Sequence, residues 1–233
     1  MRRLRLKLWL AAIRLRLRRH GVRLELSLGR NVRLAGRPRL DIDPYGTTGG
    51  GVRLTIGDHV RIGRDLVLEV RLGAEHVFEI GEGSTLQDHV RLQGRGGTIR
   101  LADHVQLRDF CELKSAGELT LGTRAICGRN VTLHCVESVA LGAHVGLAER
   151  VTITDSDHGH DGSERWFMDQ PVVVGPVVLE DNAFVATNSV VLRGSRLGRN
   201  SVVAAGAVVA GLELPDAHLG GGVPARVLKN LGS

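Results

Sequence analysis

A six-residue repeat runs through most of this 233-residue chain and limits the folds that it can adopt. Its unit has an aliphatic residue, often a following glycine, two polar positions and a small or β-branched residue, as in Ile56–Val60 and Leu197–Ser201. The aliphatic position returns every six residues without slippage at Val185, Val191, Leu197, Val203 and Val209. Such repeats predict a solenoid, in which each unit packs mainly against its neighbours.

A longer rhythm lies over the hexads. Pairs of apolar residues begin at intervals of 24, 21, 20, 20 and 38 residues along the chain. They are Leu54/Ile56, Phe78/Ile80, Ile99/Leu101, Leu119/Leu121, Val139/Leu141 and Val177/Leu179. Three hexads and a turn account for most intervals, so we predict triangular coils of three short parallel strands, with the aliphatic side chains stacked inside.

The fourth position of the hexad predicts the corners of these coils. It holds Asn31, His59, His89, His104, Asn130, His144, Asn182, Asn188, Gly194, Asn200 and Gly206. Asparagine, histidine and glycine are residues that tolerate a positive φ, so this column indicates left-handed turns. The four histidines of the column are therefore predicted to be turn residues rather than ligands. His134, His158 and His160 remain as candidates for chemistry.

The repeat stops at Ile153–Gly162, which reads ITDSDHGHDG. This stretch concentrates Asp155, Asp157, His158, His160 and Asp161. Loops on a rigid scaffold often carry function, so we expect the chemistry here. The segment continues through Trp166–Met168, whose aromatic side chains fit either a lid over a neighbouring cleft or a local cap over the coils.

The charge of the chain is unevenly distributed. Residues 1–20 hold eight basic side chains and no acidic one, which leaves 23 basic and 25 acidic residues in the remainder. A nucleic-acid-binding surface on the body is therefore unsupported. The odd number of cysteines (Cys111, Cys127 and Cys135) and the lack of a Cys-x-x-Cys spacing argue against a disulfide scaffold or a zinc knuckle. We expect a cytoplasmic protein.

The basic segment at residues 1–21 is too interrupted to span a membrane, because its longest uncharged run is Leu8–Ile13. That run is also too short for a secretory signal. Leu6, Trp9, Leu10, Ile13 and Leu17 fall on one helical face, and Leu4, Leu8 and Leu15 fall on another. Two interpretations stay open: a peripheral anchor on anionic lipid at the inner face of the membrane, or a basic segment that packs against the body or stays mobile.

Three features together resemble the hexapeptide-repeat acyltransferases with a left-handed parallel β-helix. They are the hexads, the ITDSDHGH loop followed by Gln170-Pro171, and the ending Gly221–Arg226. The similarity extends from about Leu54 to Lys229 and is greatest to the sugar O-acetyltransferases, including the galactoside, maltose and exopolysaccharide enzymes. It implies an all-β fold, a single-stranded left-handed parallel β-helix with a short basic N-terminal arm and an excursion loop.

The resemblance also implies a division of the chain. Residues 1–21 would form the basic amphipathic arm, and residues 22–214 the β-helical acyltransferase domain with its active-site loop at 155–176. Residues 215–233 would form a C-terminal segment near coenzyme A. The expected activity is transfer of an acetyl group from acetyl-CoA to a hydroxyl of a saccharide or related acceptor in polysaccharide biosynthesis. The expected assembly is a homotrimer that binds acyl-CoA between neighbouring subunits.

Individual positions follow from the same resemblance. His158 aligns with the catalytic histidine, with Asp157 beside it, and Phe184 stands where many relatives carry a tryptophan. Ala186, Thr187 and Ala205 fall where relatives contact pantetheine, and Arg226 matches a basic residue near the nucleotide phosphates. The chain departs from galactoside-type relatives at Ala210-Gly211, where they have Thr-Lys, and at their sugar-binding positions near Gly128 and Val136. The acceptor is therefore left open, including an amino sugar or a small alcohol.

The residues of the loop suit this chemistry. An alcohol is a poor nucleophile at neutral pH, and a histidine can take its proton as general base. Asp155 or Asp157 could fix the imidazole tautomer. No serine or cysteine nucleophile is evident beside His158, so we expect direct attack in a ternary complex, and Cys135 is interpreted as an inert thiol.

Two other functions are compatible with the repeat. The same β-helix forms γ-class carbonic anhydrases, for which His89, His134, His158 and His160 would be the candidate zinc ligands. The His-x4-His spacing of two ligands on one coil is missing, so no metal is expected. A non-catalytic β-helical assembly subunit is the third interpretation, and it would require the loop and the C-terminal motif to be vestigial.

Overall fold

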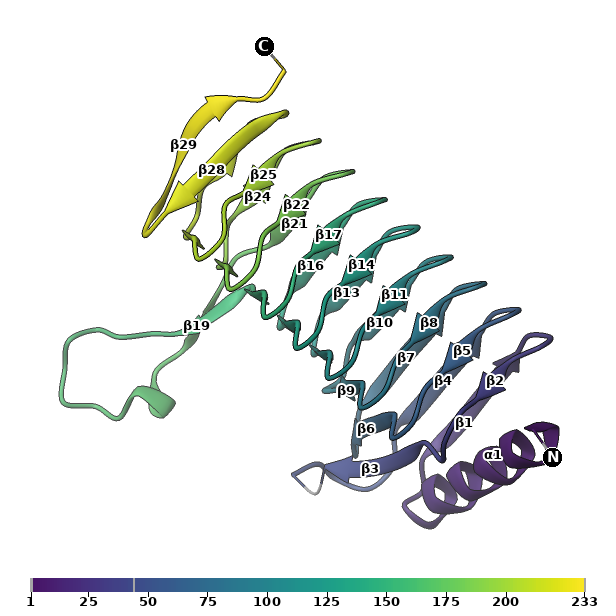
Figure 1. The fold of residues 1–233 in the computed structure, drawn as a ribbon. Coiled ribbons are helices and arrows are strands. Elements are labelled where there is room, and N and C mark those ends of the chain that lie inside the picture. The colour runs from purple at the N-terminus through teal and green to yellow at the C-terminus, as the bar shows by residue number, and fades with distance from the viewer. Residues whose placement is uncertain (1, 44, 233) are drawn as a thin grey trace.

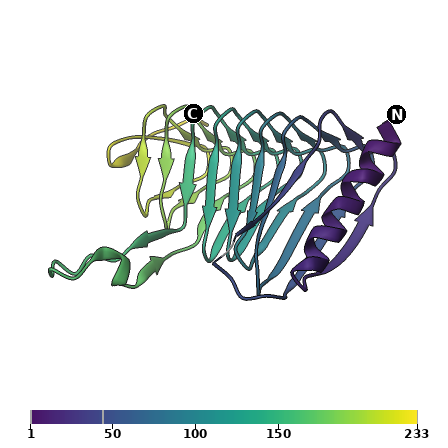
Figure 2. The ribbon, with the colours of Figure 1, turned by 90° about the horizontal axis from the view of Figure 1, so that it is seen from below.

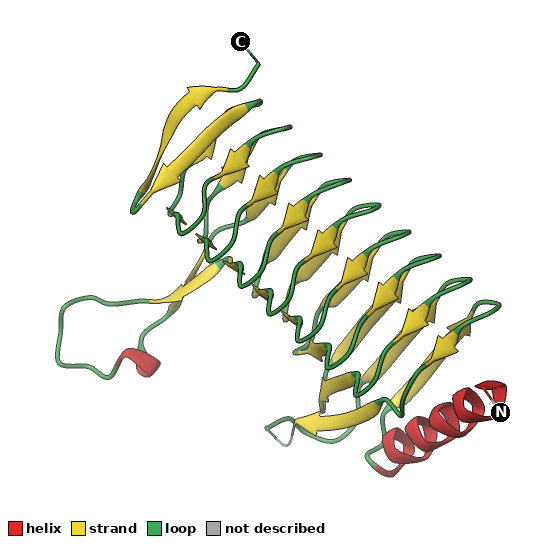
Figure 3. Cartoon of the chain, in the orientation of Figure 1, coloured by secondary structure: helices red, strands yellow, loops and turns green. Residues whose placement is uncertain are grey.

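The computed structural model describes residues 2–43 and 45–232 and shows one α-helix followed by a long parallel β-helix (Figures 1 and 3). Met1 and Ser233, the outer ends of the predicted arm and C-terminal segment, lie outside the described residues, as does Pro44. The helix α1 (Arg2–Arg19) precedes the strands, and a single 3₁₀ turn, η1 (Phe167–Asp169), interrupts them within the described chain. The predicted all-β class is confirmed.

Three sheets form the sides of the coils, and their strands are parallel except for the last strand of the second sheet, which pairs antiparallel with its neighbour. The first sheet has the order β1 (Arg23–Leu28), β4 (Gly51–Ile56), β7 (Glu75–Ile80), β10 (Thr98–Leu101), β13 (Glu118–Leu121), β16 (Ser138–Leu141), β21 (Val177–Leu179), β24 (Arg196–Leu197) and β27 (Glu213–Leu214).

The second sheet has the order β2 (Arg33–Leu34), β5 (Arg61–Ile62), β8 (Thr85–Leu86), β11 (Gln106–Leu107), β14 (Ile126–Cys127), β17 (Gly146–Leu147), β22 (Phe184–Val185), β25 (Val202–Val203), β28 (His218–Gly222) and β29 (Ala225–Asn230). The third sheet has the order β3 (Arg39–Asp43), β6 (Val67–Arg71), β9 (Arg91–Gly94), β12 (Glu112–Ser115), β15 (Thr132–Cys135), β18 (Thr152–Thr154), β23 (Val190–Val191) and β26 (Val208–Val209).

The aliphatic position of each hexad points into the coil and stacks on its equivalents. In the third sheet Leu113 pairs with Leu133, which pairs with Ile153, and all three are fully buried. Burying a side chain of this size stabilises a fold by about 1.5–3 kcal/mol. The repeat therefore specifies the fold by supplying the same inward contact in every coil.

The corners confirm the predicted turn column. Its asparagine and histidine residues have φ between 57° and 61°, and Gly194 and Gly206 have φ of 71°. The same left-handed conformation also occurs at corner positions that residue type did not reveal: Asp65, Phe110, Arg124 and Arg150. A non-glycine residue accepts this conformation at a cost of about 1–2 kcal/mol, and the backbone hydrogen bonds between stacked coils hold it there.

The helix α1 lies across the N-terminal end of the β-helix (Figures 1 and 2). It contacts β1 and β2, and its buried residues are Leu6, Trp9, Ile13 and Leu17. These side chains cover the end of the hydrophobic stack, which the first coil would otherwise expose to water. Packing against the body, one of the two interpretations of this segment, is therefore what the structure shows. Among the residues described, no helix has the length and apolar character needed to cross a membrane.

The C-terminal end is closed by a hairpin. Strand β28 continues the second sheet beside β25, and β29 pairs antiparallel with β28. Gly221 and Arg226 are paired in this hairpin, so the Gly-Gly-Val-Pro-Ala-Arg ending forms its turn. The predicted segment 215–233 is thus an extension of the β-helix as far as the described residues reach.

Candidate active site

The regular coils stop at Thr154 and resume at Val177, and the segment between them stands out from the β-helix (Figure 1). Its two ends form an antiparallel ribbon of β19 (Ser156–His158) and β20 (Val172–Val174). This ribbon leaves the third sheet after β18 and returns to the first sheet at β21. The loop therefore projects from the corner between these two sheets.

Asp155 fastens the base of the loop. Its carboxylate is fully buried and accepts hydrogen bonds from the backbone N–H groups of Val136, Glu137 and Ser138, at 2.8, 2.8 and 2.7 Å. The N–H of Gly175 also donates to the Asp155 carbonyl, which joins the two arms of the loop. Hydrogen bonds to a charged acceptor are among the stronger ones in proteins, so Asp155 holds the ribbon rigidly to the coil below.

The outer part of the loop is held by its own polar contacts. The buried Gln170 side chain accepts a hydrogen bond from Asp161 N–H at 2.9 Å and donates one to the Arg165 carbonyl at 3.1 Å. The Asp161 carboxylate bonds Ser163 and Arg165, and these contacts, led by the Ser163 hydroxyl, lower the pKa of Asp161. The Gln170-Pro171 element of the sequence motif thus closes the loop on itself.

His158 and His160 both contact one aromatic ring. The His158 ring meets Phe167 edge-on with centroids 5.3 Å apart, and the His160 ring stacks on Phe167 at 6.0 Å. Both histidines are exposed, and neither imidazole has a hydrogen-bond partner within the described chain. From the sequence Phe167 was considered only as part of a lid or a cap; its place between two histidines became visible only through the fold of the loop.

Asp157 points away from His158, because adjacent residues on a strand alternate between its two sides. Its carboxylate forms an ion pair with Arg193 at 2.8 Å, in the turn that follows β23. The structure therefore does not bring Asp157 and Asp155 to the imidazole of His158 within one chain. Asp157 instead ties the loop to the next coil, and Arg193 is the contact that sequence reasoning missed.

The residues expected to contact the acyl donor lie at a different corner. Phe184 lies on β22 in the second sheet, exposed and beside Gly146, where an added Cβ would come within 3.0 Å of the phenyl ring. Ala186 and Thr187 form the turn from the second to the third sheet, and Ala205 occupies the equivalent turn one coil later. The Gly206 N–H donates to the Thr187 carbonyl at 2.9 Å, so the two turns are stacked.

These turns offer polar backbone groups at the surface. The Thr187 hydroxyl donates to the Glu149 carbonyl at 2.8 Å, which fixes the side chain against the coil below. In the part of the chain that the structure describes, the N–H groups of Thr187 and Ala205 donate to no backbone acceptor. Arg226 is exposed in the C-terminal hairpin. The arrangement can receive a ligand that carries amide carbonyls and phosphates.

The other candidate metal ligands, His89 and His134, belong to the regular coils. His89 is a turn residue with φ of 60° that stacks on Phe110 at 4.7 Å. His134 is half-buried in the third sheet, and burial, followed by the nearby Lys114, lowers its pKa. Within residues 2–43 and 45–232, no group of three or more histidine, cysteine, aspartate or glutamate residues is arranged to hold a metal ion.

Cys135 is fully buried, and burial raises the pKa of its thiol to about 11. Cys111 is buried in the same way, with its pKa also raised to about 11. A thiol with such a pKa is protonated near neutral pH and is a poor nucleophile. The interpretation of Cys135 as inert agrees with this environment.

Comparison with known proteins matches residues 176–211 to the family described as bacterial transferase hexapeptide (six repeats). A protein of Mycobacterium tuberculosis named probable acetyltransferase Rv3034c is 32% identical over 114 residues, which are 49% of this chain and 38% of the relative. A 2,3,4,5-tetrahydropyridine-2,6-dicarboxylate N-acetyltransferase of Staphylococcus aureus is 38% identical over 60 residues, 26% of this chain and 25% of the relative. The chain thus spans well under half the length of these curated relatives.

Two solved structures are among those similar to the fold. The hexapeptide-repeat acetyltransferase VCA0836 of Vibrio cholerae, complexed with acetyl coenzyme A, is 22% identical with a TM-score of 0.45, over 67% of this chain and 70% of that one. A maltose O-acetyltransferase of Clostridium difficile is 17% identical with a TM-score of 0.38, over 92% and 72% of the two chains. The hexapeptide repeat expected from the sequence is confirmed by the match at residues 176–211.

Proposed function

We propose that this hexapeptide-repeat protein is an acetyl-CoA-dependent O-acetyltransferase that modifies a hydroxyl of a saccharide or related acceptor. The observation that carries the proposal is the loop that interrupts the coils. It presents an exposed histidine, His158, from a ribbon whose base is fixed by the buried Asp155. The name of the Mycobacterium relative, a probable acetyltransferase, supports the same reaction class.

His158 acts as the general base in this proposal. One ring nitrogen takes the proton of the acceptor hydroxyl as the oxygen attacks the thioester carbonyl carbon, within a ternary complex. The carbon–sulfur bond breaks, and the imidazolium returns the proton to the departing thiolate. General base catalysis of this kind contributes about 10²–10⁴-fold to a rate. Phe167, in edge-on contact with the ring at 5.3 Å, orients it.

Acetyl-CoA supplies the activated acyl group. The residues present fit such a donor, because in the described chain the N–H groups of Thr187 and Ala205, in the stacked turns, donate to no backbone acceptor and suit pantetheine carbonyls. The Phe184 ring offers an apolar wall beside Gly146, and Arg226 a cation for phosphates. These residues bind and orient the donor, and His158 moves the proton.

The proposal includes a homotrimer. His158 projects from the corner between the third and first sheets, whereas the proposed donor residues lie on the second sheet and at its corner with the third. One chain therefore presents the two halves of the site at different corners, and a neighbouring chain would complete each half. The loop also exposes Trp166, Phe167, Met168 and Val172–Val174, apolar side chains that suit burial against another subunit.

Asp157 has a positioning role in this scheme rather than a direct one. Its ion pair with Arg193 holds β19 against the coil that follows the loop. We also propose a cytoplasmic location, with α1 in peripheral contact with the membrane. The acceptor is proposed to be a saccharide; an amine acceptor remains the alternative, as the name of the Staphylococcus relative is that of an N-acetyltransferase.

The experiment measures release of the coenzyme A thiol from acetyl-CoA in the presence of a panel of mono- and oligosaccharides, matched amino sugars and buffer alone. We expect acceptor-dependent release with a saccharide and an ester product that alkali cleaves. Release with amino sugars only, giving an alkali-stable amide, would replace the hydroxyl with an amine. Absence of acetyl-CoA binding by calorimetry would contradict the whole proposal.

A further inference from the structure

The helix α1 has two apolar stripes, and only one of them faces the coils. Leu6, Ile13 and Leu17 are buried against the first coil, whereas Leu8 and Leu15 are 62% and 55% exposed. At 100° per residue, Leu8 and Leu15 lie about two turns apart on the side of the helix opposite the buried stripe. Ala11 and Ala12 are exposed on the same side. The two stripes explain why the segment looks imperfectly amphipathic in sequence, although each face of the helix is well defined.

Arginines border the outer stripe on both sides. Arg14 and Arg18 lie along one side and Arg16 and Arg19 along the other, and all four are exposed. None of the four forms an ion pair in the part of the chain that the structure describes. Apolar residues flanked by basic ones along a surface helix are the pattern of a helix that lies in the headgroup region of an anionic bilayer.

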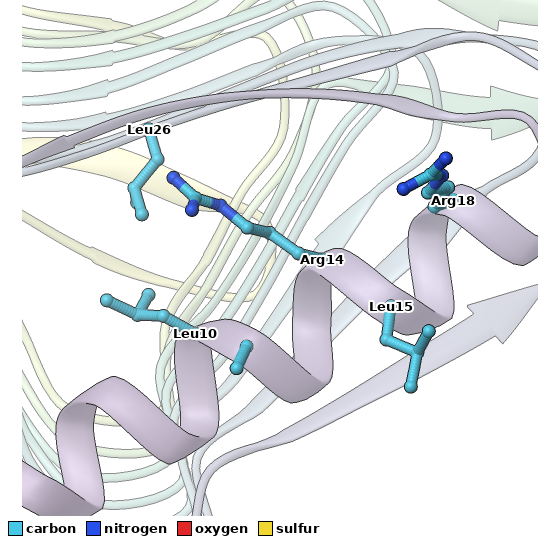
Figure 4. A pocket seen from close by; sticks show the side chains of 6 residues that line it. Leu10, Arg14, Leu15, Arg18 and Leu26 are labelled. Atoms are coloured by element: carbon cyan, nitrogen blue, oxygen red, sulfur yellow. The ribbon is translucent and has the colours of Figure 1, made fainter.

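Two depressions beside α1 combine apolar walls with a cation. The first lies between α1 and β1 and is lined by Leu10, Ala11, Arg14, Leu15, Arg18 and Leu26. In Figure 4 the Arg14 side chain reaches along this groove toward Leu26, and Leu15 points the other way.

The second depression lies on the other side of the helix, where Leu8, Trp9 and Ala12 face Gly36, Arg37 and Pro38. A lipid headgroup supplies a phosphate for the arginines that line these depressions, and the acyl chains beneath it suit their apolar walls.

We infer that α1 caps the first coil with one stripe and docks on an anionic membrane with the other, so that the β-helix stands end-on. The two roles are compatible because they use opposite faces of one helix. The orientation follows from the position of α1 across the end of the coils (Figure 2), which points its outer stripe away from the stack. The occupant is a bilayer surface, because the exposed stripe is straight, basic on both borders and free of acidic residues.

End-on docking sets the height of the catalytic loop, a step that rests on the proposed function. Five strand spacings separate β3 from β18 in the third sheet, and each is about 4.8 Å. With about 10 Å for the helix itself, His158 lies roughly 35 Å above the docking surface. An acceptor tethered to the same membrane would therefore be an extended saccharide, with its reacting hydroxyl several sugars from the lipid.

Vesicle flotation tests the docking face. The full chain is mixed with vesicles of phosphatidylcholine alone or with 30% phosphatidylglycerol, at low and high salt; the composition is about that of a moderately anionic bilayer. We expect flotation with anionic vesicles at low salt and release as salt screens the arginines. Leu8→Ser/Leu15→Ser and Arg14→Gln/Arg18→Gln should each reduce binding roughly tenfold or more, since each removes one of the two contributions.

Arg124→Gln/Arg199→Gln is the matched control, because it removes the same charge from exposed arginines far along the chain from α1. It should bind as the unaltered protein does. Circular dichroism confirms that the variants are folded, as expected for exposed positions. If the control pair loses as much vesicle binding, the effect comes from net charge and not from the position of the arginines. If Leu8→Ser/Leu15→Ser binds vesicles undiminished, the assignment of the exposed stripe as the docking face is wrong.

Energy transfer tests the end-on orientation without any substrate. The three natural cysteines are buried, so a dye can be attached at Ser27→Cys, on β1 beside α1, or at Ser163→Cys, in the loop. With acceptor-labelled lipid, the dye at position 27 should be strongly quenched and the dye at position 163 weakly, in keeping with a height of roughly 35 Å. Equal quenching would mean side-on docking. Because no turnover is measured, this result is independent of the proposed acetyl transfer.

Discussion

The regular coils and the loop at 155–176 use histidine for opposite purposes. In the coils His59, His89, His104 and His144 occupy left-handed turns with φ near 60°. In the loop His158 and His160 lie on either side of Phe167. A turn histidine fits its position because histidine tolerates a positive φ. A loop histidine instead presents its imidazole ring at the surface. All six are exposed, so the backbone angle, rather than residue type or burial, separates the two groups.

Removal of His158 should give the largest functional effect. His158→Ala is expected to lower kcat by about 10²–10⁴-fold through loss of the general base, with the affinity for acetyl-CoA nearly unchanged. His160→Ala should cost distinctly less, although it removes the same kind of ring from the same aromatic contact. Steady-state kinetics and calorimetric binding of acetyl-CoA measure the two quantities. If His160→Ala proves the more damaging, the base lies two residues further along the loop.

Asp155 should be the residue on which the loop depends for stability. The Asp155 carboxylate accepts hydrogen bonds from three backbone N–H groups. In Asp155→Asn the side-chain amide instead turns its own NH₂ group toward at least one of these donors. We expect the free energy of unfolding to fall by about 2–4 kcal/mol, as for the loss of charged hydrogen bonds at a buried site. Denaturant titration measures the loss.

Asp157→Asn is the matched control for that substitution. Asp157 makes an exposed ion pair with Arg193, and such pairs contribute about 0–1 kcal/mol. The two aspartates are two residues apart in the same loop, so equal losses for both would show that burial of the carboxylate is not what distinguishes them.

A buried histidine of the coils should make stability depend on pH. The Nδ1 atom of His76 accepts a hydrogen bond from Gly96 N–H, so Nε2 carries the proton and donates to the Arg71 carbonyl at 2.8 Å. Burial is the main cause that lowers the pKa of His76 below its unfolded value of 6.5. The unfolded chain therefore binds the proton more readily, and stability should decrease as pH falls from about 7 to 5.

His76→Gln should flatten that decrease, whatever its effect on stability at neutral pH. The free energy of unfolding, measured at half-unit pH intervals, gives the slope for each protein. His104→Asn is the control, because it removes a histidine that is exposed at a turn. An unchanged slope in His76→Gln would assign the pH dependence to other groups, of which the half-buried His134 is the next candidate, since burial also lowers its pKa.

The fold was predictable because the hexads repeat one inward contact in every coil. The turn column was predictable where it holds asparagine, glycine or histidine, but not at Phe110 or Arg124, where stacked coils impose the same conformation on residues that disfavour it. For α1 the sequence allowed capping or membrane contact as alternatives. The structure resolves the two leucine-rich faces into a buried stripe and an exposed one.

The position of the candidate site in the sequence was predictable, but most of the contacts that its residues make were not. The loop was visible as an interruption of the repeat, and its ends agree with the last and first strands around it. The role of Asp155 was not visible, although its three partners lie 17–19 residues earlier, one coil below. The pair of Asp157 and Arg193 spans 36 residues across the loop, and no local pattern indicates it.

The smallest effect is expected where the coils use histidine for its backbone. His104 is exposed, has φ of 60°, and contributes its backbone N–H to the Glu82 carbonyl at 2.7 Å. His104→Asn keeps a residue that tolerates this conformation, so stability should change by less than about 0.5 kcal/mol and activity not at all. His104→Val should cost about 1–2 kcal/mol, because a β-branched residue is strained at positive φ. Urea unfolding of both variants measures the change in stability. The steady-state kinetic assay used for His158→Ala measures their activity. A loss of activity in His104→Asn with the fold intact would show that a turn histidine has a role for its ring, and the division between coil and loop histidines would fail.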